Sequence, residues 1–600
     1  MMSWKTTTRC LWAVAALLLP TLTPGSSTLW AQGSASCPNP VPIIGATEGA
    51  MAHVRYLADD ALEGRNTGAR GARCAADYLA SYFRKLGLRG AGPNGSFFQD
   101  FEVQMGSVLG SENSFGIDNE PLALNEAWIP FGFASSGQLS GNLVYGGPGV
   151  SMPGNPDDRF AHIDLEGKIV VVEGANPHGA GTASVAGDPH HKATIAAGRG
   201  ASAVLVLLEE GQSLPRPEGE ERPTVRIPAL AISGQAAQAV RAAAEAGKEA
   251  RLTTTIEPRM VEVRNVVAMI PGSDPSLARE VVIVGAHFDH LGHGGDGSLA
   301  PDSRDVHNGA DDNASGTAAL LEVASRLAGS GNSPSRSVLF IAFTGEEKGL
   351  WGSGHYVKNP LIPLENTVAM VNMDMVGRLR DNTLTVYGTG TAQEFPEILE
   401  DVNGTQPEPF VLTEIPDGYG ASDHSSFYGE SIPVLMLFTN THADYHTPAD
   451  DWQLIEVEGL DRIVGFAADL TGTLAGSADS EALAVTYLEG AGNPHGSMAA
   501  AADDEDAPPS RGYGAYMGTI PDMTPQDYGV RITGVREGSP AEKAGLQGGD
   551  ILVEFGGHEI TDLYAYTYAL REFQPGDEIV VVVLRNGERM SFTAVLSSRG

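Results

Sequence analysis

The chain has 600 residues, which is too long for one hydrophobic core, because single cores rarely grow beyond about 300 residues. Hydrophobic residues make up 42% and charged residues 19% of the chain, so most of it can fold as globular domains. Lys and Arg number 38 against 75 Asp and Glu, a formal charge of −37. That balance argues against a nucleic-acid-binding protein and against docking on anionic lipid through a basic patch.

Residues 1–31 have the pattern of a secretory signal peptide. Lys5 and Arg9 precede an apolar run from Leu11 to Leu22, and a small-residue cleavage site follows, for example after Ala31. The run is shorter than the about 20 residues that cross a bilayer as a helix. We therefore expect an exported mature chain, periplasmic or extracellular, without a membrane span.

Three cysteines occur in the chain, and Cys10 would leave with the signal peptide. Cys37 and Cys74 remain, and two cysteines in an exported chain can pair as a disulfide. Neither has the spacing of a metal-binding cysteine. The sequence leaves the pairing open.

The rest of the chain divides by pattern into five regions. Residues 46–127 begin with helical periodicity, and residues 128–258 change to short β-rich runs with Gly-rich connections. Residues 259–475 alternate strand and helix patterns. Residues 476–511 read as an acidic flexible linker, and residues 512–600 regain the short strands of a small separate domain.

Continuous apolar runs mark the strands of the region 259–475. They are Val281 to Val284, Val338 to Phe343, Val368 to Met373 and Val434 to Phe438. Such runs fit buried strands of a mostly parallel sheet that is covered on both faces. The class expected here is α/β.

Metal-type ligands follow these runs in five segments. The segments contain His287 and Asp289, Asp311 and Asp312, Glu346 and Glu347, Asp374, and Tyr445 and His446. Ligand sites of open α/β sheets form at the carboxyl ends of strands. Imidazole and carboxylate together suit zinc and also admit cobalt or manganese. A bridging Asp would hold two ions about 3.5–4 Å apart.

These segments resemble a known family. GAHFDH, GADDNASG, FTGEEKGLWGS, NMDMVG and YHTPAD are similar to the motifs of the co-catalytic two-zinc exopeptidases, typified by bacterial secreted leucine aminopeptidases and including glutamate carboxypeptidase II. The resemblance covers residues 46–127 and 259–475. It implies the zinc exopeptidase fold, in which a mixed sheet with a mostly parallel core is flanked by helices, and two Zn²⁺ per chain.

The resemblance also implies a ligand set. His287 and Asp374 would bind one zinc, Glu347 and His446 would bind the other, and Asp312 would bridge them. The family's bridging Asp stands three residues before the Ser of the Ser-Gly pair, which favours Asp312 over its neighbour.

Further roles follow from the same resemblance. Glu346 would be the general base, Asp289 would orient His287, and Tyr445 would donate a hydrogen bond to the developing oxyanion. The segment Ser422-Asp423-His424 is also similar to the family, and its Asp and His would line the pocket. The alternative for His424 is a hydrogen-bonded structural imidazole.

The region 128–258 resembles a protease-associated domain, inserted within the peptidase domain. The likeness lies in Gly167 to Val172, Ala197 to Ala201 and Ile227 to Leu230. It implies a role in substrate access, not in catalysis.

The region 512–600 resembles a PDZ domain of the bacterial type, most specifically in Gly548 to Leu552. Its carboxylate-binding loop would be Tyr516, Met517, Gly518 and Thr519. Such domains bind the C-terminal end of a peptide by strand addition. The alternative is a β-domain that serves only as a spacer.

The sequence therefore indicates an exported zinc metallopeptidase acting on peptides or proteins, with an aminopeptidase favoured. A carboxypeptidase or dipeptidase of the same family, a one-zinc glutaminyl cyclase and a non-catalytic peptide-binding relative are the alternatives. Side-chain preference and oligomeric state are not readable. Gly294 to Asp305 is either a flexible loop or a calcium-binding segment.

Overall fold

A computed structural model describes most of the chain. The described residues are 36–38, 49–149, 160–175, 187–219, 222–295, 297–300, 303–331, 333–476, 483–488, 515–521, 529–536, 538–561, 563–585 and 587–597. The expected signal peptide at 1–31 and most of the expected linker at 476–511 lie outside them. Among the described helices, none combines the length and the apolar composition that a membrane span needs.

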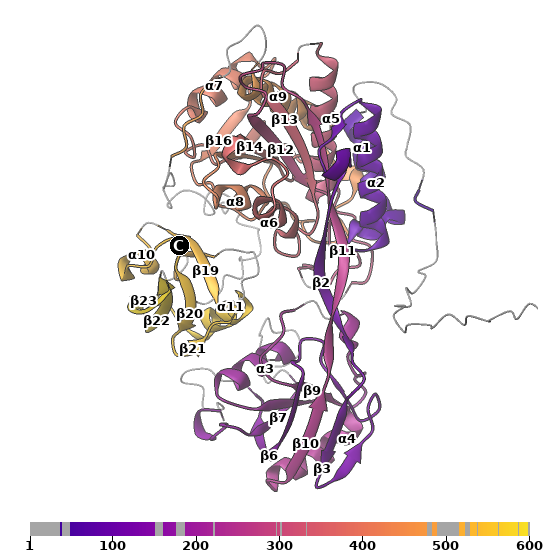
Figure 1. Ribbon diagram of the computed structural model, residues 1–600, viewed down its shortest axis with the longest axis vertical. Helices are drawn as coiled ribbons and strands as arrows, with labels where there is room; N and C mark the ends of the chain where they lie inside the picture. Colours follow the sequence, from indigo (N-terminus) through magenta and orange to yellow (C-terminus); the bar gives the residue numbers. More distant parts are fainter. Residues whose placement is uncertain are drawn as a thin grey trace, which may run out of the picture. The chain divides into compact units, whose positions relative to one another are not determined.

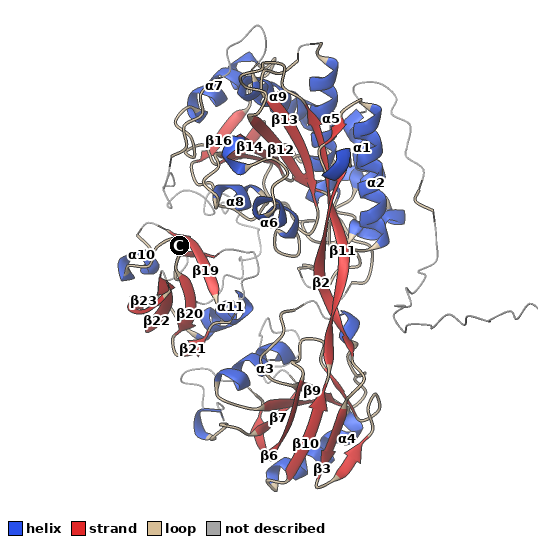
Figure 2. Cartoon of the chain, viewed as in Figure 1, coloured by secondary structure: helices blue, strands red, loops and turns tan. Residues whose placement is uncertain are grey.

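The first sheet is mixed, with a parallel centre (Figures 1 and 2). Its strand order is β1-β11-β13-β12-β14-β17-β15-β16, and β2 pairs with β11. The bounds are β1 Arg89–Gly90, β2 Phe98–Leu109, β11 Ile256–Ile270, β12 Val281–His287, β13 Ser337–Phe343, β14 Thr367–Met373, β15 Thr383–Tyr387, β16 Val411–Ile415 and β17 Val434–Phe438. β13, β12, β14 and β17 run parallel to their neighbours in this central group. The predicted class and its parallel core are confirmed.

Helices cover both faces of this sheet. One face packs against α1 Gly49–Leu57, α2 Arg70–Lys85, α5 Gly316–Gly329, α7 Phe395–Thr405 and α9 Val457–Ala475, and the other against α6 Trp351–Lys358 and α8 His424–Tyr428. Because successive side chains of a strand point to opposite faces, Val282 and Val284 belong to one core and Val281 and Ile283 to the other. All seven residues of β12 are buried, which explains the unbroken apolar run in the sequence.

The second sheet has the strand order β4-β3-β10-β6-β7-β8-β9-β5. The bounds are β3 Ser114–Ile117, β4 Glu120–Leu122, β5 Trp128–Pro130, β6 Gly137–Gly147, β7 Ile169–Glu173, β8 Ala203–Leu207, β9 Ala229–Ile232 and β10 Glu249–Thr254. Helix α3 Pro189–Gly198 packs in one of its cores and α4 Gly234–Glu245 in the other. β11 follows β10 after one residue and pairs with β2 along most of its length, as a long ribbon in Figure 1.

The expected boundary at residues 127 and 128 needs correction. β3 and β4 form a hairpin through Asp118 and Asn119, and β3 pairs with β10 of the second sheet. Residues from Ser114 onward therefore belong to the second sheet rather than to the first. The hairpin turn carries no composition change that a sequence pattern would mark as a boundary.

The third sheet has the order β18-β19-β20-β22-β23, with β21 paired to β20. The bounds are β18 Thr519–Pro521, β19 Val530–Val535, β20 Ile551–Phe555, β21 His558–Glu559, β22 Glu578–Arg585 and β23 Glu588–Val595, with helices α10 Pro540–Ala544 and α11 Leu563–Glu572. Its core is formed entirely by residues between Ala515 and Leu596. These residues build a small domain with its own hydrophobic core.

Two cysteines are oxidised. Cys37 and Cys74 are both disulfide-bonded, which agrees with the pairing that an exported chain favours. Cys74 lies on the buried side of α2.

Candidate metal centre

The candidate ligands gather where the parallel strands of the first sheet end. His287 is the last residue of β12, Asp374 directly follows β14, and Glu346 and Glu347 follow β13 after two residues. Since these strands are parallel neighbours, their carboxyl ends meet at one edge. Asp312 reaches the same place from η6, a π-helical turn over Ala310–Ser315 at the start of α5.

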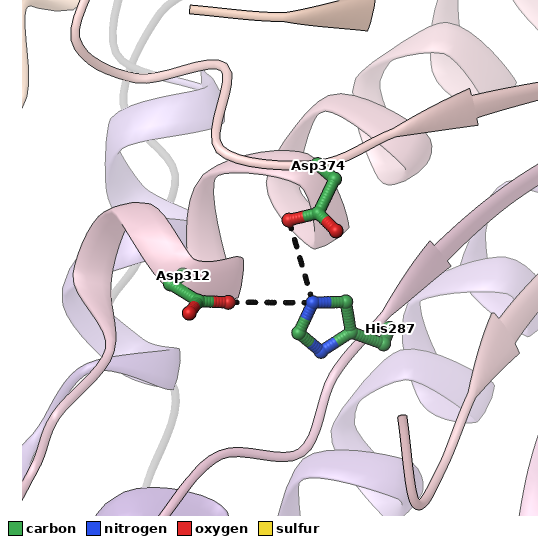
Figure 3. Close-up of side chains that lie close together, drawn as sticks. All are labelled: His287, Asp312 and Asp374. Carbon is green, nitrogen blue, oxygen red and sulfur yellow. Dashed lines mark ion pairs between the residues drawn. The ribbon is translucent and has the colours of Figure 1, made fainter. Parts of the chain in front are cut away.

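His287, Asp312 and Asp374 form the first cluster (Figure 3). The His287 Nε2 atom lies 3.3 Å from Asp312 Oδ1 and 3.4 Å from Asp374 Oδ1. Its Nδ1 atom is 3.3 Å from the main-chain carbonyl of Asp289. Nδ1–H is thus directed to a carbonyl, and Nε2 points to the two carboxylates.

The second cluster shares Asp312 and contains His290 and Glu347, and His446 lies against the same two carboxylates. The His446 Nε2 atom lies 3.1 Å from Asp312 Oδ2 and 3.3 Å from Glu347 Oε2. Its Nδ1 atom is 2.8 Å from the carbonyl of Gly297. As in His287, Nδ1 therefore faces a carbonyl and Nε2 faces carboxylates. His446 adopts a positive φ of 54° in the loop beyond β17, and Tyr445 stacks on it with ring centroids 3.8 Å apart.

The spacing of these donor atoms fits zinc. Nitrogen and oxygen ligands at about 2.0–2.2 Å from a tetrahedral zinc lie about 3.4 Å from each other. The four His-to-carboxylate distances, 3.3, 3.4, 3.1 and 3.3 Å, agree with that value. Each oxygen of Asp312 faces a different imidazole, as a bridging carboxylate requires.

Burial and the neighbouring histidines shift the pKa values of the carboxylates in opposite directions. Burial alone raises the pKa of Asp312, but hydrogen bonds with His287 and His446 outweigh it and hold the pKa well below its usual range. Burial and Asp312 likewise raise the pKa of Glu347, and His290 and His446 outweigh them, so its pKa is about 2. Buried carboxylates are costly unless cations compensate them, so the centre is suited to divalent ions.

Glu346 lies farther from the imidazoles than the ligand candidates do. Its Oε2 atom is 4.0 Å from His287 Nε2, beyond the spacing of two ligands on one zinc. Burial raises its pKa well above the usual range, and the charges of Glu347 and Asp374 add to this against the opposing effect of His287. The adjacent carboxylates therefore differ, with Glu347 in the ligand cluster and Glu346 beside it.

Asp289 is buried behind His287. Its carboxylate accepts hydrogen bonds from Thr67 Oγ1 at 2.7 Å and from the Glu346 main-chain N–H at 3.2 Å. The carboxylate is 3.9 Å from His287 Nδ1, whereas the carbonyl of the same residue is 3.3 Å away. The main-chain carbonyl of Asp289 is thus the nearer partner of His287 Nδ1, and an orienting role for Asp289 stays a prediction.

Tyr445, Asp423 and His424 were predicted to surround the metal ligands. Burial raises the pKa of Tyr445 above its usual range, and the nearby carboxylates of Asp312 and Glu347 add to the shift. Burial raises the pKa of Asp423 to about 7 and lowers that of His424 to about 3. Neither ring nitrogen of His424 has a hydrogen-bond partner among the described residues, which disagrees with a hydrogen-bonded structural imidazole.

Three residues that hold the centre together did not stand out in the sequence. Arg65 donates to the carbonyls of Phe288, Asn308 and Gly309, which flank the cluster residues. Asp450 accepts the main-chain N–H groups of both Asp311 and Asp312, each at 3.0 Å, and His290 contacts Glu347. In the sequence, His290 was marked only as the second His of GAHFDH, and Asp450 only as the last residue of YHTPAD.

The alternative of a calcium-binding segment at 294–305 finds no support here. Among the described residues, neither group of metal-type side chains includes a residue of this loop. Residues 296, 301 and 302 of this loop lie outside the description. Its Ser298 hydroxyl contacts His307 Nε2 at 2.8 Å.

The first residue of the expected carboxylate-binding loop, Tyr516, is held by a backbone hydrogen bond. The N–H of Tyr516 donates to the carbonyl of Ser597, so this amide is not directed to a ligand. Met517 is buried, and Gly518 has a positive φ of 79°. Thr519 begins β18, an edge strand in the order found for the third sheet.

Comparison with known proteins gives two family matches. Residues 265–471 match the Peptidase family M28, and residues 516–596 match the PDZ domain. The first match includes all of the candidate ligands, and the second covers the third sheet. Residues 265–471 are therefore similar to the M28 peptidases, and residues 516–596 are similar to PDZ domains.

Several curated relatives match part of the chain, and some of them are named as aminopeptidases. Leupeptin-inactivating enzyme 1 of Streptomyces exfoliatus is 31% identical over 239 residues, which are 38% of this chain and 49% of the relative. Aminopeptidase YwaD of Bacillus subtilis is 27% identical over 45% of this chain and 56% of its own length. The chain thus spans about half the length of these relatives.

Solved structures give a weaker likeness. A zinc aminopeptidase from Bacillus subtilis superposes with a TM-score of 0.44 at 22% identity, over 72% of this chain and 95% of that one. A peptidase M28 precursor from Shewanella amazonensis gives 0.41 at 20% identity, over 74% and 95%.

Proposed function

We propose that this protein is a zinc-dependent aminopeptidase that hydrolyses the first peptide bond of peptides with two Zn²⁺ per chain. The observation that carries the proposal is the pair of clusters that share Asp312, with donor atoms spaced as ligands of one zinc each. Curated relatives that are named as aminopeptidases favour this class over the carboxypeptidase and dipeptidase classes.

In this proposal five residues hold the metals: His287, Asp374, Glu347, His446 and the bridging Asp312. Two zinc ions there would lower the pKa of a water molecule and polarise the carbonyl of the scissile bond. The Nδ1 contacts of both imidazoles to carbonyls orient the rings, which fixes Nε2 as the ligand atom.

Glu346 acts as the general base. It stands beside the ligand cluster rather than in it, so its carboxylate is available to take the proton of the attacking water and to pass it to the leaving amine. A metal pair would lower its pKa from the raised value of the metal-free site. The Tyr445 hydroxyl, whose raised pKa keeps it protonated, would donate to the oxyanion.

The test is Glu346→Gln, which keeps the size of the side chain and removes the base. We expect kcat for an aminoacyl anilide to fall by about 10²–10⁴-fold with two zinc ions still bound. Glu365→Gln, on an exposed turn of the same domain, is the matched control and should behave as the wild type. Wild-type hydrolysis by Glu346→Gln would disprove the assigned base.

The same assays separate the alternatives. Cleavage of peptides only when their amino terminus is free supports the aminopeptidase, whereas cleavage of amino-blocked peptides supports a carboxypeptidase. One zinc per chain with cyclisation of N-terminal Gln would identify a glutaminyl cyclase. Peptide binding without metal and without hydrolysis would identify a non-catalytic relative.

The other regions receive separate proposals. The second sheet would act as a protease-associated domain that governs substrate access, and its removal should change KM for long peptides more than for anilides. The PDZ domain would bind a C-terminal peptide along the edge of β18, beside Met517 and Gly518. Equal affinity for free and amidated peptide C-termini would contradict this.

Export is proposed from the leader at 1–31. The protein recovered from the periplasm or the medium should begin after the leader, and N-terminal sequencing tests this. Protein that stays inside the cell with Lys5 and Arg9 still present would contradict it.

A further inference from the structure

His290 stands against the second cluster and has no role in the ligand set above. Its ring is fully buried, and its Nδ1 atom lies 2.6 Å from Glu347 Oε1. The same nitrogen is 4.0 Å from Asp312 Oδ2, too far for a hydrogen bond. The contact with Glu347 is therefore the specific one.

The surroundings of His290 fix the place of its ring. Its main-chain N–H points to the carbonyl of Arg65 at 3.3 Å, and Arg65 is itself anchored on three carbonyls of this region. Gly309 allows the close approach, since a Cβ there would lie 2.5 Å from Cγ and Cδ2 of the imidazole. The ring also meets His446 edge to face, with centroids 5.7 Å apart.

The distances decide between two roles for this imidazole. Two ligands on one tetrahedral zinc lie about 3.4 Å apart, and the His446-to-Glu347 distance of 3.3 Å agrees. The His290-to-Glu347 distance of 2.6 Å is too short for two such ligands and suits a charge-assisted hydrogen bond. His290 thus contacts a ligand without having the spacing of one.

The two oxygens of Glu347 are divided between the two histidines. Oε1 faces His290 Nδ1, and Oε2 faces His446 Nε2. The remaining nitrogen, His290 Nε2, is buried and has no hydrogen-bond partner among the described residues. A ring that carries a hydrogen on Nδ1 can donate it to Glu347 Oε1.

We propose that His290 is a positioning residue for the second metal. Its Nδ1–H donates to Oε1 of Glu347 and thereby turns Oε2 toward the ion that Glu347 and His446 share with Asp312. The inference rests on the proposed two-zinc function. A hydrogen-bonded partner of this kind affects metal affinity typically by 10–100-fold.

The test compares His290→Asn with His290→Gln in the full chain. The Asn amide nitrogen can take the place of Nδ1–H, whereas the longer Gln side chain cannot place its amide there. Metal-free protein is titrated with zinc against a chelating competitor, and the affinities of the first and second ions are measured. His293→Asn, an exposed histidine three residues away, is the matched control.

We expect His290→Gln to bind the second ion at least 10-fold more weakly, with the first ion unaffected. His290→Asn should stay within a few-fold of the wild type, and His293→Asn should equal it. Wild-type affinity in His290→Gln would overturn the positioning role, and equal losses in both His290 variants would show that the hydrogen bond is not what matters.

Failure of the proposed function has a different signature. In that case the wild-type protein itself would bind fewer than two zinc ions. Thermal unfolding of the metal-free variants shows whether either substitution perturbs the fold rather than the site.

Discussion

Arg65 links two chain segments of the metal centre. Its guanidinium is fully buried and donates to the carbonyls of Phe288, Asn308 and Gly309. These carbonyls belong to the two segments that carry His287 and Asp312. Burial lowers the pKa of Arg65 to about 10, against the effect of Asp289 and the other acids nearby, so the side chain stays charged near neutral pH.

We expect Arg65→Lys to lower the free energy of unfolding by about 2–4 kcal/mol, because one ammonium group cannot reach carbonyls that a planar fork contacts from several sides. Denaturant unfolding of the metal-free protein measures this. Arg73→Lys is the control, since exposed Arg73 donates to the Gly68 carbonyl, which Lys can also reach. Equal stability of the two variants would refute the role of Arg65.

At the scale of elements, a buried polar network joins three helices. His53 on α1 contacts Tyr78 of α2 through Nδ1 at 2.5 Å and Glu322 of α5 through Nε2 at 3.2 Å. Tyr82 donates to the same Glu322 oxygen at 3.2 Å. This network packs the N-terminal helices onto α5, the helix that begins at η6 and its Asp312.

His53 and Glu322 both contribute less to the free energy of unfolding as the pH falls. Burial lowers the pKa of His53 below 6.5, although Glu322 opposes the shift. Burial raises the pKa of Glu322, but His53 outweighs it, so the net pKa is lowered below 4.5. For a lowered pKa the stabilisation is complete above the unfolded value and is lost as the pH falls.

We therefore expect His53→Ala to cost about 2–3 kcal/mol at pH 8, where Tyr78 and Glu322 lose a buried partner. The difference from the wild type should shrink as the pH falls below 6.5 and shrink further below 4.5. Denaturant unfolding of both proteins from pH 8 to pH 4 gives this difference. A cost that grows toward acid would contradict the sign of both shifts.

The sequence predicted best the strands that are buried on both faces. Buried parallel strands leave continuous apolar runs, so Val338 to Phe343 and Val434 to Phe438 agree with β13 and β17 within a residue. Half-exposed hairpins leave no such run, so the expected boundary at residues 127 and 128 did not mark that β3 and β4 belong to the second sheet.

In the candidate site, too, some residues could be predicted from the sequence and others could not. His287 ends β12 and Glu347 follows β13, so chain order and topology together place them at one edge, and Asp312 opens the helix α5 beside them. Arg65 and Asp450 act through main-chain groups of distant segments. Such contacts have no pattern in a single sequence, because their partners can be any residue type.

On the scale of the whole molecule, most of the acidic excess is solvated surface, and a few acids are not. Asp312, Asp374, Glu346 and Glu347 converge on His287, His290 and His446 at the carboxyl ends of the central strands. Four of the 75 acids of this chain are brought together inside the protein, where their negative charges repel one another. Divalent ions relieve this repulsion.

Metal binding should therefore stabilise the fold as well as supply the chemistry. A ligand that binds the native state alone adds about 4 kcal/mol at a thousand times its dissociation constant. The most direct measurement is the zinc content per chain, taken by elemental analysis alongside hydrolysis of an aminoacyl anilide and the unfolding temperature. We predict two zinc ions per chain, loss of hydrolysis and a lower unfolding temperature on chelation, and recovery of both when zinc is restored. A protein that holds one zinc or none, or that hydrolyses the anilide after complete removal of metal, would contradict the account.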